Sequence, residues 1–95
     1  MKYGTVLHVA LQNHDFRLSY KMAKNMLKIK DFSPVKEFNR TDSEGNTPLH
    51  LVMRYFNNDV HYAKKICLFL LQNGANLKLP NKNELTPLNH ALYYV

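Results

Sequence analysis

The chain has 95 residues, a formal net charge of +6 and one cysteine. This length suffices for one small domain, and a lone cysteine cannot form an internal disulfide. A disulfide-stapled secreted scaffold is therefore excluded, and we expect a reducing, intracellular compartment, most simply the cytoplasm. The longest apolar run, residues 66–71, is far shorter than the ~20 residues that span a bilayer, so we expect no membrane insertion.

A short phrase occurs three times along the chain. Its copies begin at Thr5, Thr47 and Thr86 and read TVLHVA, TPLHLV and TPLNHA. The Thr hydroxyl can cap the first turn of a helix. A following Pro already has helical φ and lacks an N–H that this turn would leave unpaired. Each copy therefore predicts the start of a helix, and repetition at a spacing of a few tens of residues predicts a stack of repeats.

The middle copy resembles an ankyrin repeat. Residues 42–51, DSEGNTPLHL, carry the T-P-L-H phrase of that family, and residues 70–76, LLQNGAN, follow it as the end of a second helix. The resemblance is weaker in the copies at both ends. It implies an all-α fold built as a stack of helix-turn-helix repeats, and it implies a protein-protein interaction module that binds another protein.

The repeats are longer than the family's usual length. Thr5 and Thr47 are 42 residues apart and Thr47 and Thr86 are 39 apart, against roughly 33 for the family. We therefore expect enlarged repeats within a single domain. That domain is expected over residues 1–95, with repeats at about 1–41 and 42–80 and a partial repeat at 81–95.

The extra residues are expected in loops beside the second helices. In the middle copy they fall between the two helices, around residues 55–59. In the first copy they are expected at the same place and again after the second helix, at residues 30–38. Apolar periodicity predicts the second helix of the middle copy over about residues 60–73, with Asp59 as its N-cap and Gly74 as its left-handed end.

The second helix of the first copy is predicted to be amphipathic. Its expected buried side carries four apolar residues at helical spacing, and its expected solvent side carries lysines. The apolar residues are Leu18, Met22, Met26 and Ile29, and the lysines are Lys21, Lys24 and Lys28.

No set of residues indicates catalysis. His8 and His50 occupy the T-x-L-H position, where the resemblance implies bonds to the capping Thr and nearby backbone rather than a chemical role. His61 and Cys67 lie six residues apart with no further ligands at zinc spacing. The chain has no Gly-rich phosphate loop and no G-x-S-x-G motif. We therefore predict no catalytic residue, no metal and no cofactor, and we do not expect an enzyme.

The resemblance also implies where a partner binds. In the family, contacts come from the finger-like turn before each Thr and from positions just after the small residue of the first helix. Arg and Tyr are the side chains that most often anchor interfaces. The resemblance carries this role onto Ser43, Glu44, Asn46, Arg54, Tyr55, Lys82, Asn83, Tyr93 and Tyr94.

The positive charge is concentrated in the first part of the chain. Residues 1–40 hold eight Lys or Arg and three Asp or Glu, whereas residues 41–95 hold five and four. Such an excess beside aromatic residues could bind nucleic acid or another acidic surface. Lysines also solvate the outer face of a helix without any ligand, so we favour this simpler interpretation and do not expect nucleic acid. A basic binder stays an alternative, as does a structural segment of a larger assembly.

The two ends of the chain predict an incomplete stack. Repeat stacks need about three repeats and polar outer faces on the terminal ones. In the third copy, Leu88, Ala91 and Leu92 are expected to pack back onto the middle repeat and to leave an apolar edge on the far side. We therefore expect a fragment of a longer repeat protein, a chain completed by neighbours, or self-association through the uncapped C-terminal end.

Overall fold

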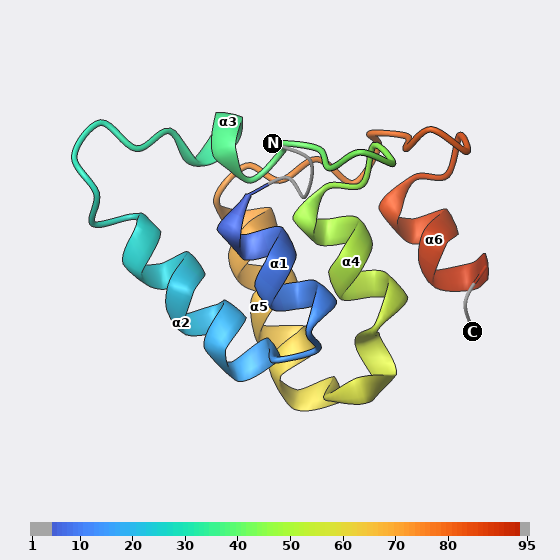
Figure 1. Cartoon of the computed structure of the whole chain (residues 1–95), viewed down its shortest axis with the longest axis horizontal. Coiled ribbons are helices and arrows are strands. Elements are labelled where there is room, and N and C mark those ends of the chain that lie inside the picture. The colour runs from blue at the N-terminus through green and yellow to red at the C-terminus, as the bar shows by residue number, and fades with distance from the viewer. Residues whose placement is uncertain (1–4, 94–95) are drawn as a thin grey trace.

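The structure is a computed structural model that describes residues 5–93 and consists of helices joined by loops (Figure 1). No strand occurs in this part of the chain, which confirms the predicted all-α fold. Within the same residues, no helix has both the length and the apolar character that crossing a membrane requires. The elements are α1 (Val6–Gln12), α2 (Phe16–Met26), α3 (Pro34–Glu37), α4 (Pro48–Arg54), the 3₁₀ helix η1 (Phe56–Asn58), α5 (Val60–Gln72) and α6 (Pro87–Tyr93).

The helices form a two-layered stack. In Figure 1, α1, α4 and α6 lie side by side in one row, with α4 in contact with both neighbours. Helix α2 packs on α1, α5 packs on α4, and α2 and α5 also pack on each other, so they form the second row. The loops that precede α4 and α6 lie together at one end of the first row (Figure 1). Each of the first two repeats thus contributes one helix to each layer.

Each helix of the first row begins at the predicted Thr. The hydroxyl oxygens of Thr5 and Thr47 accept the backbone N–H three residues later at 3.3 Å, and that of Thr86 does so at 3.2 Å. Pro48 and Pro87 occupy the first helical position of α4 and α6. The prediction that the repeated phrase starts a helix is therefore correct in all three copies.

The core lies between α1, α2, α4 and α5. Its largest buried side chains are leucines, an isoleucine and two phenylalanines, and the small residues Ser19 and Ala23 of α2 are buried among them. The fully buried large apolar residues are Phe16, Phe38, Leu7, Leu11, Leu49, Leu51, Ile66, Leu70 and Val52.

The predicted buried side of α2 is only partly correct, because Met22 and Met26 are half-buried and Met26 packs against the core. Leu18 and Ile29 are 47% and 58% exposed, and the buried residues of α2 are Phe16, Ser19 and Ala23. Small side chains let a neighbouring helix approach closely, so Ser19 and Ala23 face the core although neither is strongly apolar. A prediction that ranks residues by hydrophobicity alone therefore misses the part of the contact face that Ser19 and Ala23 form.

The placement of the extra residues is correct in the middle repeat and partly wrong in the first. Helix η1 occupies the enlarged connection between α4 and α5, as expected. In the first repeat, only residues 13–15 separate α1 from α2, because Asp15 immediately caps α2 through its side chain. The whole enlargement of that repeat follows α2, where the loop and the short helix α3 cover Phe38 and the end of α5.

The expected packing of α6 also needs correction. Leu88 and Leu92 are 59% and 69% exposed rather than packed on the middle repeat. Helix α6 instead turns Pro87 and His90 toward α4, and both are buried. Leu88 corresponds to Leu49, which in its own repeat lies between two layers. No second-layer helix covers Leu88 among residues 5–93, so its side chain faces solvent.

Candidate interaction groove

The two turns before α4 and α6 are built by the same hydrogen bonds. In the first finger, residues 42–46, Asp42 Oδ1 accepts the N–H groups of Glu44 and Asn46, both at 2.9 Å. In the second finger, residues 81–85, Asn81 Oδ1 accepts the corresponding N–H groups at 2.9 and 3.0 Å. A short polar side chain that bonds the backbone two and four residues on holds a tight turn in place. The predicted finger-like turns are therefore present.

The two fingers are bonded to each other. The N–H of Lys82 donates to the carbonyl of Glu44 at 3.0 Å, and Asn81 Nδ2 donates to Asn46 Oδ1 at 2.9 Å. Gly45 allows this approach, because it has a φ of 78° and a Cβ there would lie 2.8 Å from the Lys82 nitrogen. The fingers consequently form one continuous polar edge.

His8 and His50 tie each first-row helix to the finger of the next repeat. His8 Nδ1 accepts the N–H of Thr5 at 3.0 Å, so Nε2 carries the proton and donates to the Asn46 carbonyl at 2.8 Å. His50 repeats this arrangement with Thr47 at 3.0 Å and Leu85 at 2.8 Å. Burial lowers the pKa of both imidazoles. The structural interpretation of these histidines is correct.

The third copy replaces this arrangement with a different histidine. Asn89 occupies the equivalent position and bonds to the Thr86 hydroxyl at 2.9 Å. The next residue, His90, is buried, and its Nδ1–H donates to the carbonyl of His50 at 2.9 Å. Burial lowers the pKa of His90 as well. This contact was not predicted, although the third copy of the phrase has its histidine displaced by one position.

A polar hollow lies between the first finger and the end of α4. We call it the finger groove. It has a volume of ≈ 280 Å³ and combines acidic and amide side chains with one Arg and one Tyr. It is lined by Gln12, Asp42, Ser43, Glu44, Asn46, Leu51, Arg54 and Tyr55.

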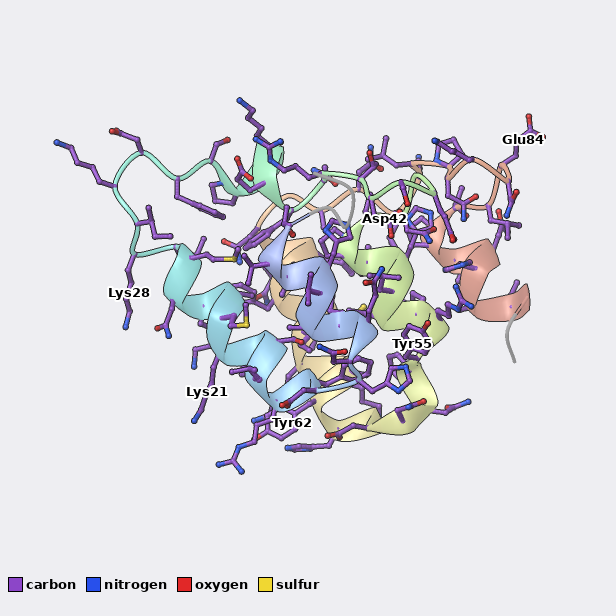
Figure 2. All side chains as sticks on the ribbon, viewed as in Figure 1. Lys21, Lys28, Asp42, Tyr55, Tyr62 and Glu84 are labelled. Atoms are coloured by element: carbon purple, nitrogen blue, oxygen red, sulfur yellow. The ribbon has the colours of Figure 1, made fainter. Side chains whose placement is uncertain are left out.

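Tyr55 is held in place at the far end of the finger groove from Asp42 (Figure 2). Its ring lies 4.2 Å from the ring of His14, and the Arg54 guanidinium lies 5.3 Å from its centroid. Asn58 Nδ2 in turn donates to His14 Nδ1 at 3.1 Å. An aromatic ring that is already fixed between two neighbours loses little conformational entropy when a partner covers it.

The nine predicted contact residues separate into groups. Ser43, Glu44, Arg54 and Tyr55 line the finger groove with exposed or half-buried side chains. Asn46 also lines it, but it is 2% exposed and bonded to Asp42, His8 and Asn81, so it holds the fingers rather than faces a partner. Lys82 and Asn83 are exposed on the second finger. Tyr94 and the side chain of Tyr93 lie outside the described residues.

Three residues of the groove were not predicted. Leu51 lines the groove with only 2% of its surface exposed, Gln12 comes from α1, and Asp42 shapes the first finger. Asp42 had a usable signal, because it stands 39 residues before Asn81, the same interval that separates Thr47 from Thr86. Gln12 had none, because only the stacking of α1 against α4 brings it there.

Comparison with known proteins assigns the class. The family model described as ankyrin repeat matches residues 44–82, which run from the first finger through α4 and α5 to the second finger. No solved structure matches the chain significantly. Residues 44–82 therefore match an ankyrin repeat, and the helices of the chain form an ankyrin-type stack. Ankyrin repeats in general serve as protein-protein interaction modules and are typically non-catalytic.

Proposed function

We propose that this chain is a non-catalytic module that binds one protein partner through the finger groove. The observation that carries the proposal is the fixed position of Tyr55, between His14 and Arg54, beside a polar finger. Tyr and Arg supply large contact areas and dominate binding energy at interfaces. Ser43 and Glu44 are exposed at the rim, where they can form hydrogen bonds that select the partner.

The second finger extends the proposed surface. Its backbone is bonded to the first finger through Lys82 and Glu44, so Lys82 and Asn83 continue the same edge. Asn46 and Asp42 serve this surface indirectly, because their side chains set the shape of the first finger. We further propose that the partner is met inside the cell, since half-buried Cys67 is a free thiol.

The test is a double substitution, Arg54→Ala with Tyr55→Ala, in a binding measurement by calorimetry. The partner is first captured from the native source and identified by mass spectrometry. Loss of both anchors should weaken binding by ten-fold or more, on the order of 2 kcal/mol. Circular dichroism of the variant should keep its helical form, because the lost groups line a surface hollow.

A matched control is available on the opposite layer. Lys65 lies 5.6 Å from the ring of Tyr62, so Tyr62→Ala with Lys65→Ala removes the same two kinds of contact from α5. This control should keep the parent's affinity. Equal affinity of the parent and of the folded Arg54 and Tyr55 variant would reject the finger groove as the binding surface.

A second candidate function is a structural segment of a larger assembly or longer repeat protein. The exposed Leu88 and Leu92 on α6 favour it, because an additional helix or a second copy could cover them. Self-association through this C-terminal surface is one form of the same proposal. The size of the chain in solution distinguishes these possibilities from a monomer that binds its partner reversibly.

A further inference from the structure

The second layer of the stack carries positive charge without acidic neighbours on its own helices. Helices α2 and α5 contain Arg17, Lys21, Lys24, Lys64 and Lys65 and no Asp or Glu. The acids that precede them, Asp15 and Asp59, already accept the N–H groups of Leu18 and Tyr62 as helix caps. The two helices with their caps thus hold five basic and two acidic side chains, so this layer has a net positive charge.

Lys21 and Lys24 of α2, together with Lys28 just after that helix, line a hollow between the two repeats. Lys21, Lys24 and Lys28 follow one another at helical spacing, and in Figure 2 Lys21 and Lys28 project away from the body of the molecule. The hollow has a volume of ≈ 520 Å³ and also includes apolar surface. We call it the outer hollow, and it is lined by Lys21, Lys24, Asn25, Leu27, Lys28 and Phe69.

Lysines from both helices lie over one aromatic ring next to this hollow. Lys24 Nζ and Lys65 Nζ lie 5.0 and 5.9 Å from the centroid of Tyr20, and Phe69 meets the same ring edge-on with the centroids 6.0 Å apart. Among residues 5–93, these lysines form no ion pair. Like charges held close together repel each other, and a ligand of opposite charge relieves that repulsion.

We propose that the outer hollow binds an acidic peptide segment that carries one apolar side chain. The apolar side chain sits on Leu27 and Phe69, and carboxylates flanking it pair with the lysines that line the hollow. Pairs formed at the edge of an apolar contact are partly shielded from water, which strengthens them relative to fully exposed pairs. This surface lies on α2 and α5 and is independent of the finger groove.

The lining favours a peptide over nucleic acid and over a membrane. Single strands stack their bases on open aromatic faces. Here ammonium groups already lie over Tyr20, and Lys65 also covers Tyr62. Membrane-surface helices insert protruding apolar side chains. Leu18 and Leu68 protrude from α2 and α5 at 47% and 60% exposure but do not line the hollow, whereas Phe69 is half-buried within it and can receive a side chain.

The experiment measures fluorescence anisotropy of a short labelled peptide of Glu and Ser with one central Phe. The variant Lys21→Gln, Lys24→Gln, Lys28→Gln should bind it at least about ten-fold more weakly than the parent. Lys30→Gln, Lys36→Gln, Lys78→Gln removes equal charge from exposed positions outside the outer hollow and should change binding less than about two-fold. Replacing the central Phe by Ser should also weaken binding to the parent.

Other outcomes would overturn the proposal. Equal losses in both triple variants would mean that only net charge attracts the peptide. If the parent did not bind the peptide, the outer hollow would not be an acidic-peptide site. If the parent bound an oligothymidylate or phosphatidylserine vesicles more tightly than the peptide, the surface would instead be a nucleic-acid or membrane site. The Arg54→Ala, Tyr55→Ala variant should bind the peptide as the parent does. A failure of the finger-groove proposal can therefore be distinguished from a failure of the outer-hollow proposal.

Discussion

Glu84 adopts a left-handed backbone conformation, with a φ of 64°, at the position where the first finger has Gly45 with a φ of 78°. Both residues stand at the same point of equivalent turns, two positions before Thr47 and Thr86. Glycine adopts this conformation without steric cost, whereas a side chain there costs of order 1–3 kcal/mol. The Glu84 side chain projects into solvent at the tip of the second finger (Figure 2), so the turn tolerates it.

Glu84→Gly should therefore stabilise the fold. We expect the free energy of unfolding to rise by about 1 kcal/mol, because relief of the strain exceeds the added entropy of the unfolded chain. Urea denaturation followed by circular dichroism measures this change. Gly45→Ala is the opposing control and should destabilise, since its Cβ would press on the Lys82 nitrogen at 2.8 Å. A decrease in stability on Glu84→Gly would contradict this account of the second finger.

At the scale of elements, histidines join helices to fingers. His8 and His50 each accept a backbone N–H at Nδ1 and donate from Nε2, an arrangement that only a neutral imidazole can make. His90 is likewise buried between α6 and α4. The contacts between successive repeats therefore depend on uncharged histidine side chains.

Stability should consequently fall as the solution becomes acidic. Burial lowers the pKa of His8, His50 and His90 below the value of 6.5 that the unfolded chain has. The unfolded chain therefore binds more protons just below that pH. The stabilisation is complete above about pH 6.5 and is lost as pH falls toward the folded-state values, by up to about 1.4 kcal/mol per pH unit for each histidine.

Urea denaturation at a series of pH values between about 7.5 and 5 checks this dependence. His50→Gln should show a shallower pH dependence than the parent, whereas His61→Gln, which alters an exposed histidine, should keep the parent's slope. Parallel curves for all three proteins would mean that the buried histidines do not determine the acid sensitivity.

At the scale of the whole molecule, the stack exposes apolar side chains at both ends of its first layer. Val6 and Val9 on α1 are 59% and 40% exposed, whereas Leu51, which corresponds to Val9, is buried against α1. On α6, Leu88 and Leu92 are exposed as described above. Surfaces of this kind mark contacts with other protein or promote association.

Leu88→Gln with Leu92→Gln should therefore reduce self-association of the 95-residue chain. Sedimentation velocity at tens of micromolar should show a larger monomer fraction for this variant than for the parent. Ile29→Gln with Leu68→Gln removes side chains that are 58% and 60% exposed elsewhere and should leave the parent's distribution unchanged. A parent that sediments as a monomer would reject self-association through α6.

Features that depend on bonds between nearby residues could be predicted from the sequence, whereas features that depend on contacts between distant residues could not. Helix starts at Thr5, Thr47 and Thr86 depend on bonds between residues three apart, so the repeated phrase was sufficient to locate them. The buried face of α2 was not predictable in this way, because Ser19 and Ala23 are buried only by contact with other helices. Within the groove, Arg54 and Tyr55 were predicted because they follow the repeated phrase closely. Gln12 was not predicted, because α1 contributes it across the stack.

The sequence by itself determined the repeat, its helix starts, its fingers and the all-α class, because the same local bonding pattern recurs in each copy of the phrase. Only the tertiary structure decided which side chains meet across repeats. It placed Asn46 in the bonds between fingers, seated His90 against α4, and brought Lys24 and Lys65 over one tyrosine ring. The contacts of Asn46 with Asn81, of His90 with His50 and of Lys65 with Tyr20 join residues 35 to 45 positions apart, and their geometry follows from helix packing rather than from any local pattern.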